Sequence, residues 1–353
     1  KLVNEVIFGH AKQSADAPNI SRKAALMARL PEEIPAYTVH RQCASGMQAI
    51  INAVWQIQVG YGDIIVAGGV ESMSTAPFYL RHARFGYRAG NGELLDPNTE
   101  SQPQSQPEDV YGKFTMGMTA ENLAEAYNIS REEQDLFAFE SQSKAIKAID
   151  SGKFKNEIVP VTVKKGKETV VFEVDEYPKR DTSLEKLAKL KPVFKTNGTV
   201  TAGNSSGRND GAAAVVVMSE QKAWELGIKP LARFVSAGMS GVDPRIMGIG
   251  PVPASKMALE KAGLTLDDIG LIELNEAFAA QSLAVIKEMG LNREILNVNG
   301  GAIALGHPLG CSGMRITVTL IHEMIKSKAR FGLATLCVAG GLGVATIYEN
   351  LAL

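Results

Sequence analysis

Residues 45–69 read SGMQAIINAVWQIQVGYGDIIVAGG, and residues 312–341 read SGMRITVTLIHEMIKSKARFGLATLCVAGG. Each stretch begins with Ser-Gly-Met and enters a segment with the apolar spacing of an amphipathic helix. It then passes a turn that contains glycine and ends in an apolar strand that finishes with Val-Ala-Gly-Gly. A unit that recurs at the two ends of a chain predicts two halves of similar structure.

Short apolar runs occur along the whole chain, within the repeat and outside it. We expect a strand at residues 5–9 and buried strands at residues 64–67, 213–218, 271–274 and 333–338, because each is a compact run of apolar or β-branched residues. Segments with helical apolar spacing separate these runs. Strands that alternate with helices are typical of the α/β class, which we therefore predict.

Residues 77–204 have a different composition from the two halves. They are polar and charged, and they include the tract NTESQPQSQPED at residues 98–109 and a lysine-rich stretch at residues 186–195. The sequence SREE at residues 130–133 has the pattern of a capping box at the start of a helix. We interpret residues 77–204 as an inserted loop domain that contains some helix.

The composition argues against several classes of function. The 37 basic and 38 acidic residues give a net charge of −1, so no overall charge attracts nucleic acid or an anionic membrane, and we expect neither partner. Three cysteines in 353 residues argue against a disulfide framework and favour a reducing compartment, which we take to be the cytoplasm. No apolar run reaches the roughly 18 residues of a membrane span.

Sequence patterns of metal and nucleotide sites are absent. The chain has no Cys-x-x-Cys, no His-x-x-x-His, no Walker loop and no Gly-x-Gly-x-x-Gly that leads from a strand into a helix. Zinc chemistry, nucleotide hydrolysis and nicotinamide chemistry therefore lose support. We expect no metal and no permanently bound cofactor.

Cys43 is the first candidate for chemistry. It lies in HRQCASGM, at the entrance to the first expected helix of the repeat. A thiol at a helix N-terminus faces free N–H groups and the positive end of the helix dipole, and both favour the nucleophilic thiolate. A free cysteine is more often a small buried hydrophobe, and that alternative stays open at this point.

Cys337 is the second candidate, because it ends an expected strand and precedes Val-Ala-Gly-Gly. Small residues there would let successive backbone N–H groups approach a ligand oxygen, as an oxyanion hole requires. The same glycines would equally suit a tight turn between two strands. From these residues alone, the two interpretations have equal support.

His307 and Asn275-Glu276 are polar residues in settings that suit a site. Pro308 keeps His307 out of a helix, and glycines on both sides leave room around its imidazole. Asn275 and Glu276 follow an expected strand directly, where open α/β sheets place their sites. An amide could hold a water and a carboxylate could orient an imidazole, with a plain helix cap as the alternative.

Together these segments resemble the four active-site motifs of the thiolase family. The motifs are HRQCASGMQA at residues 40–49, NEAF at 275–278, GHPLGCSG at 306–313 and CVAGG at 337–341, in the family's order. Further matches lie at residues 67–74, 201–207 and 297–301, so the resemblance covers essentially the whole chain. Their joint occurrence is far more specific than any single motif.

The resemblance implies the thiolase fold, an α/β architecture of five layers αβαβα with two pseudo-symmetric halves and an inserted loop domain. We then expect an N-terminal half at residues 1–76 and 205–230, a loop domain at 77–204 and a C-terminal half at 231–353. The family's first strand and helix would lie before Lys1, where an organellar targeting peptide would also have its place.

The resemblance also implies a ping-pong mechanism on coenzyme A (CoA) thioesters. Cys43 would attack the thioester and become acylated, and Cys337 would act as base or acid at the α-carbon of the second acyl-CoA. His307 Nε2 and a water held by Asn275 would meet the thioester oxygen. The backbone N–H groups of Cys43 and Ala339 would meet the acyl-enzyme oxygen.

For the CoA moiety, the family pattern implies contacts along the pantetheine and at the adenine end. Ser206 and Met247 would lie along the pantetheine, with Met116, Phe194 and Phe278 nearby. Lys179 falls where an arginine often meets the adenine. The lysines of residues 186–195 favour a solvated face, with a site for CoA phosphates as the alternative.

Three residues depart from the family pattern. Thr115 stands where short-chain members commonly have histidine, and Ala339 replaces a usual glycine. His40 stands where asparagine is frequent. The first two leave the preference for acyl-chain length open more than the class of reaction.

Several functions fit these motifs. The first is an acetyl-CoA acetyltransferase that condenses two acetyl-CoA to acetoacetyl-CoA and CoA, and the second is a 3-ketoacyl-CoA thiolase of fatty-acid β-oxidation. A ketoacyl synthase would need a second catalytic histidine where Asn275-Glu276 stand. A non-catalytic CoA- or lipid-binding protein would not need four intact motifs. The resemblance further implies a homodimer or homotetramer.

Overall fold

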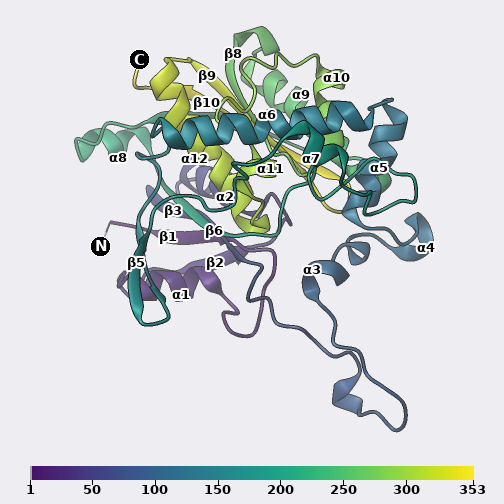
Figure 1. The fold of residues 1–353 in the computed structure, drawn as a ribbon. Coiled ribbons are helices and arrows are strands. Elements are labelled where there is room, and N and C mark those ends of the chain that lie inside the picture. Colours follow the sequence, from purple (N-terminus) through teal and green to yellow (C-terminus); the bar gives the residue numbers. More distant parts are fainter. Residues whose placement is uncertain (1) are drawn as a thin grey trace.

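The computed structural model describes residues 2–353, which form two four-stranded sheets with helices between and around them (Figure 1). The strand orders are β2-β1-β3-β6 in the first sheet and β7-β10-β9-β8 in the second. The first sheet consists of β1 (Glu5–Gly9), β2 (Ala36–Val39), β3 (Ile64–Ser72) and β6 (Asp210–Met218). The second consists of β7 (Ala232–Gly241), β8 (Ile269–Leu274), β9 (Phe331–Val338) and β10 (Leu342–Asn350).

Two helices lie between the sheets. Helix α2 (Ser45–Gln58) packs on the inner face of the first sheet, and α12 (Leu309–Ser327) contacts α2 and strands of both sheets. Helix α1 (Ile20–Met27) covers the outer face of the first sheet, whereas α9 (Pro251–Ala262) and, behind it, α10 (Ala279–Met289) cover that of the second. The layers therefore run αβαβα, which confirms the predicted fold class.

The duplicated unit is confirmed by matching connections in the two sheets. In the first sheet α2 leads into β3, which runs parallel to β1 and antiparallel to β6. In the second sheet α12 leads into β9, which runs parallel to β8 and antiparallel to β10. The two halves differ in one connection, because residues 73–209 join β3 to β6 whereas only residues 339–341 join β9 to β10.

Glycines let the two inner helices approach each other closely. A Cβ on Gly46 would lie 2.9 Å from the carbonyl oxygen of Gly310, and one on Gly69 would lie 2.6 Å from the same oxygen. Side chains at these positions would push the N-terminus of α12 away from α2 and β3. The first turns of α2 and α12 therefore meet at the middle of the molecule.

The 73–209 connection folds mainly against the second half. Its elements are α3 (Pro97–Glu100), α4 (Glu108–Tyr111), α5 (Met116–Ala126), α6 (Arg131–Asp150), β4 (Val161–Lys165), β5 (Glu168–Phe172) and α7 (Leu184–Ala188). The predicted capping box at the start of α6 is confirmed, since Ser130 Oγ accepts from Glu133 N and Glu133 accepts from Ser130 N. The limits of this domain stay a prediction.

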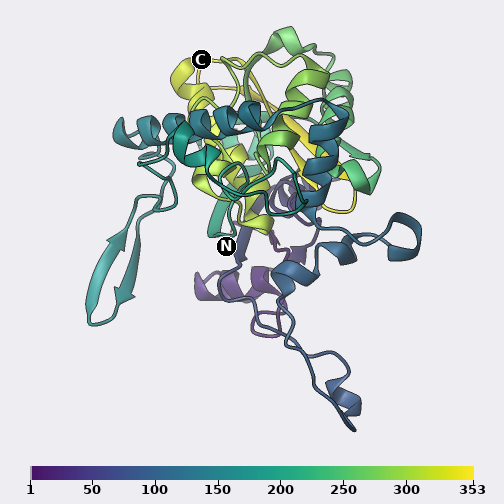
Figure 2. The same cartoon turned by 45° about the vertical axis from the view of Figure 1, so that its right-hand side comes forward.

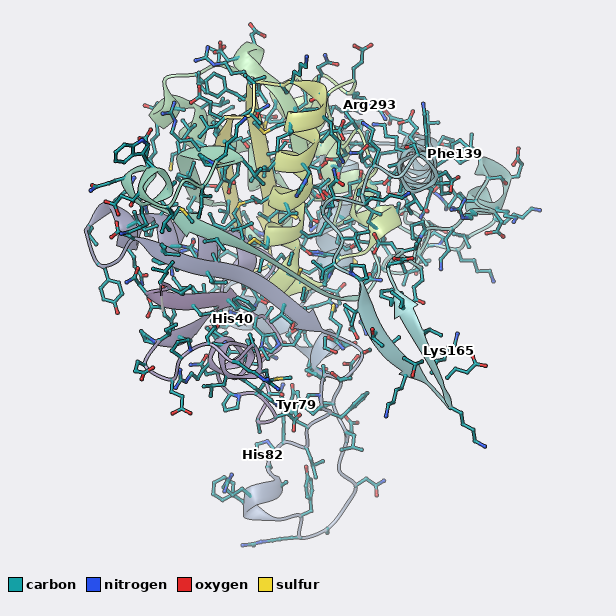
Figure 3. The ribbon with its side chains drawn as sticks, turned by 90° about the vertical axis from the view of Figure 1, so that its left-hand side faces the viewer. His40, Tyr79, His82, Phe139, Lys165 and Arg293 are labelled. Carbon is teal, nitrogen blue, oxygen red and sulfur yellow. The ribbon has the colours of Figure 1, made fainter. Side chains whose placement is uncertain are left out.

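Two parts of this connection project from the rest of the chain. The β4–β5 hairpin extends from one side and the arm of residues 77–95 from another (Figure 2). Tyr79 and His82 lie on the arm, and Lys165 lies at the end of β4 in the hairpin (Figure 3). The remaining elements are short: α8 (Glu220–Glu225), α11 (Ala302–Leu305) and 3-10 turns at Ala83–Phe85, Pro103–Ser105, Pro244–Ile249 and Leu266–Asp268.

Two sequence-based expectations about these elements are wrong. Residues 213–218 do form part of a strand, but β6 is an edge strand with alternate residues exposed, and Val216 is 57% exposed. An edge strand lacks a neighbour on one side, so its apolar run is not covered as a central strand is. Ser312 does not open α12, because the helix begins at Leu309.

No helix within residues 2–353 is long and apolar enough to span a membrane.

Candidate active site

Cys43 occupies a tight turn between β2 and α2. The preceding residue, Gln42, has a φ of 45°, a left-handed conformation that is rare outside glycine. Two hydrogen bonds hold the turn in this conformation, because Arg41 N donates to Ser45 Oγ at 2.8 Å and Ser45 Oγ donates to Gln42 O at 2.6 Å. Backbone strain held in this way is typical of functional sites. The turn fixes the thiol at the start of α2.

The Cys43 thiol is met by the other half of the chain. Cys43 packs against the core cluster that includes Leu336 and Val338 of β9, and the backbone N–H of Ala339, in the turn between β9 and β10, acts to lower the pKa of its thiol. Ala339 itself is absent from the positive-φ residues, and Gly340 and Gly341 carry the left-handed geometry of the turn with φ of 87° and 82°. The backbone at position 339 therefore accommodates the Cβ of alanine without strain.

The expected stabilisation of the Cys43 thiolate by the helix N-terminus is outweighed by burial. Burial raises the pKa of the thiol to about 11, although the Ala339 N–H and the Lys12 ammonium both act to lower it. The free-energy cost of removing water from the ionised sulfur is larger than the stabilisation that these two groups give it. Cys43 is therefore a thiol at neutral pH, and the expectation that the helix N-terminus favours its thiolate was wrong.

Cys337 lies on β9 next to this site. The residue is 2% exposed and packs with Met247, Ala277, Met116 and Phe278. Burial raises the pKa of its thiol, and the charge of Cys43 raises it further. Cys43 packs against the core cluster that includes Val338, the residue after Cys337, so the two thiols belong to one site.

Asn275 follows β8 at the same edge of the second sheet. Its backbone N–H donates to Thr335 O at 3.0 Å, on the neighbouring strand that carries Cys337 two residues later. The side chain is fully buried, and neither its Nδ2 nor its Oδ1 has a partner among residues 2–353. A buried amide without partners is costly, so this side chain is suited to hold a water or a substrate oxygen.

His307 is brought to the site by α12, as Cys43 is by α2. Each residue lies two positions before the first residue of its helix, and the two helices touch at Gly46 and Gly310. The His307 backbone N–H donates to Asn209 Oδ1 at 3.1 Å. Burial lowers the pKa of the imidazole to about 4, so His307 is neutral at neutral pH.

A serine hydroxyl sets the tautomer of His307. Ser312 Oγ donates to Pro308 O at 2.9 Å and also lies 2.6 Å from His307 Nδ1. A hydroxyl has a single proton, so Nδ1 must donate to Ser312, and Nε2 then carries the lone pair. The neutral imidazole can therefore accept a proton at Nε2 and afterwards donate it.

Five of the six residues predicted to contact CoA gather beside Cys337. Met116, Met247 and Phe278 pack with Cys337 itself. Phe194 meets Phe278 edge to face, with ring centroids 6.2 Å apart. Ser206 donates from both its backbone N–H and its Oγ to Ala277 O at 3.0 Å. Together they form one largely apolar surface next to Cys337.

The comparison with known families agrees with this geometry. The family model described as "Thiolase, N-terminal domain" matches residues 1–221, and "Thiolase, C-terminal domain" matches residues 228–350. The chain belongs to the thiolase family.

Relatives of this thiolase are similar over nearly their full length. An acetyl-CoA acetyltransferase of Syntrophomonas wolfei subsp. wolfei is 53% identical over 353 residues, which cover 99% of this chain and 88% of the relative. An acetyl-CoA acetyltransferase of Pseudomonas aeruginosa is 52% identical over 344 residues, or 97% and 86% of the two chains.

Solved structures of thiolases superpose closely on this one. The crystal structure of the Bacillus anthracis acetyl-CoA acetyltransferase has a TM-score of 0.95 and 52% identity, and the match covers 99% of this chain and 87% of that one. Human mitochondrial 3-ketoacyl-CoA thiolase also has a TM-score of 0.95, with 46% identity over 99% and 88% of the chains. The fold is therefore shared by thiolases of both predicted types.

The sequence suggested that Glu276 could orient the His307 imidazole, but in this thiolase it does not. Its carboxylate accepts from Ser141 Oγ at 2.6 Å, Asn297 Nδ2 at 2.9 Å and Ile303 N at 3.2 Å. Glu276 therefore anchors the 297–303 loop behind the site. Asn275 and Glu276 are not helix caps either, because the N-cap of α10 is Phe278.

Glu71 of this thiolase lies in the matched segment of residues 67–74, but the sequence alone assigned it no role. Its buried carboxylate accepts from Ala11 N, Lys12 N and Gly310 N at 2.8–3.0 Å and pairs with His10 Nε2 at 3.1 Å. Burial alone would raise the pKa of Glu71, but these donors lower it below its usual value. The ionised carboxylate ties the start of α12, and thus His307, to the first half.

Lys179 lies apart from the surface beside Cys337. It borders a cavity of about 210 Å³ together with Tyr177, Gln142 and Gly203, and its ammonium lies 4.9 Å from the Tyr177 ring centroid. A Cβ on Gly207 would lie 2.2 Å from the Tyr177 hydroxyl, so this cavity adjoins the segment that carries Ser206.

No cluster of His, Cys, Asp or Glu in the described chain, residues 2–353, is arranged to hold a metal ion.

Proposed function

We propose that this thiolase is an acetyl-CoA C-acetyltransferase, which condenses two acetyl-CoA to acetoacetyl-CoA and CoA through an acetyl-cysteine on Cys43. The observation that carries the proposal is the meeting of two thiols from opposite halves, since Cys43 packs against the core cluster that includes Val338, the residue after Cys337. The acetyl-CoA acetyltransferases at 52–53% identity support acetyl-CoA as the substrate.

In the first half-reaction Cys43 takes the acetyl group. A bond forms between Cys43 Sγ and the carbonyl carbon as His307 Nε2 accepts the thiol proton. The carbon–sulfur bond to CoA then breaks, and the departing CoA sulfur takes the proton of Cys337. The products are acetyl-Cys43, protonated His307, ionised Cys337 and CoA. The N–H groups of Ala339 and Cys43 receive the acyl oxygen.

In the second half-reaction the Cys337 thiolate takes an α-proton from another acetyl-CoA. The α-carbon attacks acetyl-Cys43, a carbon–carbon bond forms, and Cys43 leaves as a thiolate that recovers the proton of His307. Negative charge on the thioester oxygen faces protonated His307 Nε2 and a water on Asn275, whose amide is otherwise without partners. The cycle returns both cysteines to thiols.

CoA would lie along the surface beside Cys337, with its pantetheine against Ser206, Met247, Met116 and Phe278 and its adenine end toward Lys179. CoA thioesters enter as substrates and leave as products, so no permanent cofactor is needed. A homodimer or homotetramer and a cytoplasmic location stay predictions.

The test is incubation with acetyl-CoA followed by intact mass and peptide mapping. We expect one acetyl adduct on Cys43, formation of acetoacetyl-CoA, and no adduct in Cys43→Ala. A wild-type chain without an adduct would indicate a non-catalytic CoA- or lipid-binding protein instead. Decarboxylation of a malonyl thioester should be absent, in contrast to a ketoacyl synthase.

A degradative 3-ketoacyl-CoA thiolase is the second candidate. Thr115 at the start of α5 and the similarity to human mitochondrial 3-ketoacyl-CoA thiolase favour it. Thiolysis rates of acetoacetyl-CoA and 3-ketohexadecanoyl-CoA separate the two. A strong preference for the longer chain would overturn the proposed acetyl specificity and leave the chemistry of Cys43 intact.

A further inference from the structure

A lysine side chain is buried next to the turn that carries Cys43. Lys12, in the loop after β1, is 9% exposed, and its backbone N–H donates to Glu71 at 3.0 Å. The preceding residue, Ala11, accepts a hydrogen bond from His40 Nε2 at 3.1 Å through its carbonyl oxygen. Since His40 lies three residues before Cys43, the Lys12 loop and the Cys43 turn are held together.

The Lys12 ammonium anchors a segment that crosses the site. We call residues 97–105 the crossing segment. Lys12 Nζ donates to Pro97 O at 3.1 Å and to Ser101 Oγ. At its other end, the carbonyl oxygen of Ser105 lies 2.9 Å from where a Cβ on Gly340 would stand. The crossing segment therefore spans from Lys12 to the turn that presents the Ala339 N–H.

The two carboxylates near Lys12 are occupied by other donors. Glu71 accepts from three backbone N–H groups and from His10, as described above. Asp96 pairs with Arg208 at 3.0 Å and also accepts from Asn98 N at 2.8 Å. Within residues 2–353, no ion pair of 4.0 Å or less includes Lys12. Its ammonium is thus buried without a carboxylate partner.

A buried ammonium in this position favours an anion near it. Lys12 has three N–H donors, of which two are used on neutral oxygens of the crossing segment. Burial lowers the pKa of Lys12, and the charge that most opposes this lowering is that of Cys43, ahead of Glu71 and Asp96, whereas Arg208 adds to it. Reciprocally, Lys12 lowers the pKa of Cys43 and Glu71 raises it.

We propose that Lys12 is a positioning residue for catalysis, whose ammonium is the charge partner of the Cys43 thiolate and fixes the crossing segment beside it. The inference rests on the proposed nucleophilic role of Cys43. Lys12 contacts neither acyl group nor CoA in this scheme. It acts through Cys43, because a fixed positive charge in a site of low dielectric increases the fraction of ionised sulfur.

The test measures ionisation of Cys43 without any acyl-CoA. The rate of alkylation of Cys43 by iodoacetamide is followed against pH, with peptide mapping to separate Cys43 from Cys311 and Cys337. Lys12→Gln removes the charge and keeps an N–H donor for Pro97 and Ser101. We expect its profile to move about one unit to higher pH, with alkylation about tenfold slower at neutral pH.

Two further variants separate charge from packing. Lys12→Arg keeps a positive charge and should restore most of the alkylation rate, whereas Lys12→Met should behave as Lys12→Gln does. Lys144→Met is the matched control, because Lys144 is also a partly buried lysine that donates to a backbone carbonyl, Leu296 O at 3.0 Å. Its profile should coincide with the wild type.

The proposal is overturned if Lys12→Gln alkylates with the wild-type profile, or if Lys12→Arg is as slow as Lys12→Gln. Should Lys12→Gln not fold, the comparison of Lys12→Met with Lys12→Arg decides in the same way. The outcome is independent of turnover. A wild-type chain that forms no acetyl adduct contradicts the proposed function, whereas an unchanged alkylation profile contradicts only the role of Lys12.

Discussion

Cys43 packs against the core cluster that includes Val338, and the backbone N–H of the next residue, Ala339, acts to lower the pKa of the Cys43 thiol. Ala339 lies after β9 of the second half and Cys43 before α2 of the first, so the two halves meet at the thiol. An N–H that acts on the sulfur lies close to where the oxygen of an acyl group on that sulfur would be. This contact therefore links the fold directly to the proposed chemistry.

Replacement of Cys337 should separate acylation from condensation. In Cys337→Ala the Cys43 turn is intact, so acetyl-CoA should still acetylate Cys43, while formation of acetoacetyl-CoA should fall by about 100- to 10,000-fold with the loss of the base. Mass spectrometry of the adduct and a condensation assay measure the two steps. Cys311→Ala, at the third buried thiol, is the control and should keep activity. Equal loss of acylation in Cys337→Ala and Cys43→Ala would refute the division of roles.

Asn275→Ala should reduce activity more than stability. The side-chain amide has no hydrogen-bond partner within residues 2–353, so its removal breaks no bond that holds the fold. If it holds the water that meets the thioester oxygen, kcat should fall about 100- to 1000-fold. Steady-state kinetics and the Tm together test this. A lowered Tm with unchanged kcat would show a purely structural residue.

Ser312→Ala should impair His307 through its tautomer. Without the Ser312 oxygen, Nδ1 loses the acceptor that directs the lone pair to Nε2, and we expect kcat to fall by about 100-fold. Thr317→Val is a matched control, because Thr317 Oγ1 also donates to the carbonyl four residues back on α12, at 2.8 Å, without touching the imidazole. Equal effects of the two changes on kcat would exclude the tautomer as the cause.

Glu273 should make the stability of the protein depend on pH. Burial raises the pKa of its carboxyl to about 8 against a usual 4.5, although Arg315, 3.6 Å away, acts to lower it. The pKa of Glu273 is higher in the folded than in the unfolded protein, so Glu273 does not reduce the free energy of unfolding below about pH 4.5. Between about pH 4.5 and 8 the free energy of unfolding falls by about 1.4 kcal/mol for each unit by which pH rises. Glu273→Gln should flatten the free energy of unfolding over this window.

The control for that measurement is Glu260→Gln, at an exposed carboxylate of α9. It should leave the dependence on pH as in the wild type. Some slope should remain in Glu273→Gln, because burial also raises the pKa of Glu157, to about 7. An identical slope in wild type and Glu273→Gln would show that Glu273 is ionised in the folded protein.

Gly69→Ala should weaken the contact between β3 and α12. The new Cβ would lie 2.6 Å from Gly310 O, so the start of α12 must shift, at a cost of about 1–3 kcal/mol in the free energy of unfolding. Gly241→Ala is the control, since the nearest atom to its Cβ is 3.9 Å away. Urea denaturation compares the two. We also expect lower activity in Gly69→Ala, because the same shift moves His307.

Local patterns could predict much of this protein because they depend only on neighbours in the chain. The helix of residues 45–58, the strand that ends at Cys337 and the capping box at Ser130 each follow from periodicity or from a turn signal over a few residues. The exposed face of β6 could not be predicted, because it depends on what covers the strand.

The sequence alone predicted two similar α/β halves, with Cys43 at the entrance to a helix and Cys337 at the end of a strand, and its motifs identified the family. Only the tertiary structure decided the electrostatics of the site. The raised pKa of Cys43, the tautomer that Ser312 imposes on His307, the use of Glu276 on a loop and the burial of Lys12 beside Glu71 depend on groups far apart in the chain. Burial and hydrogen bonding set these properties, and both are defined only once distant segments are packed together.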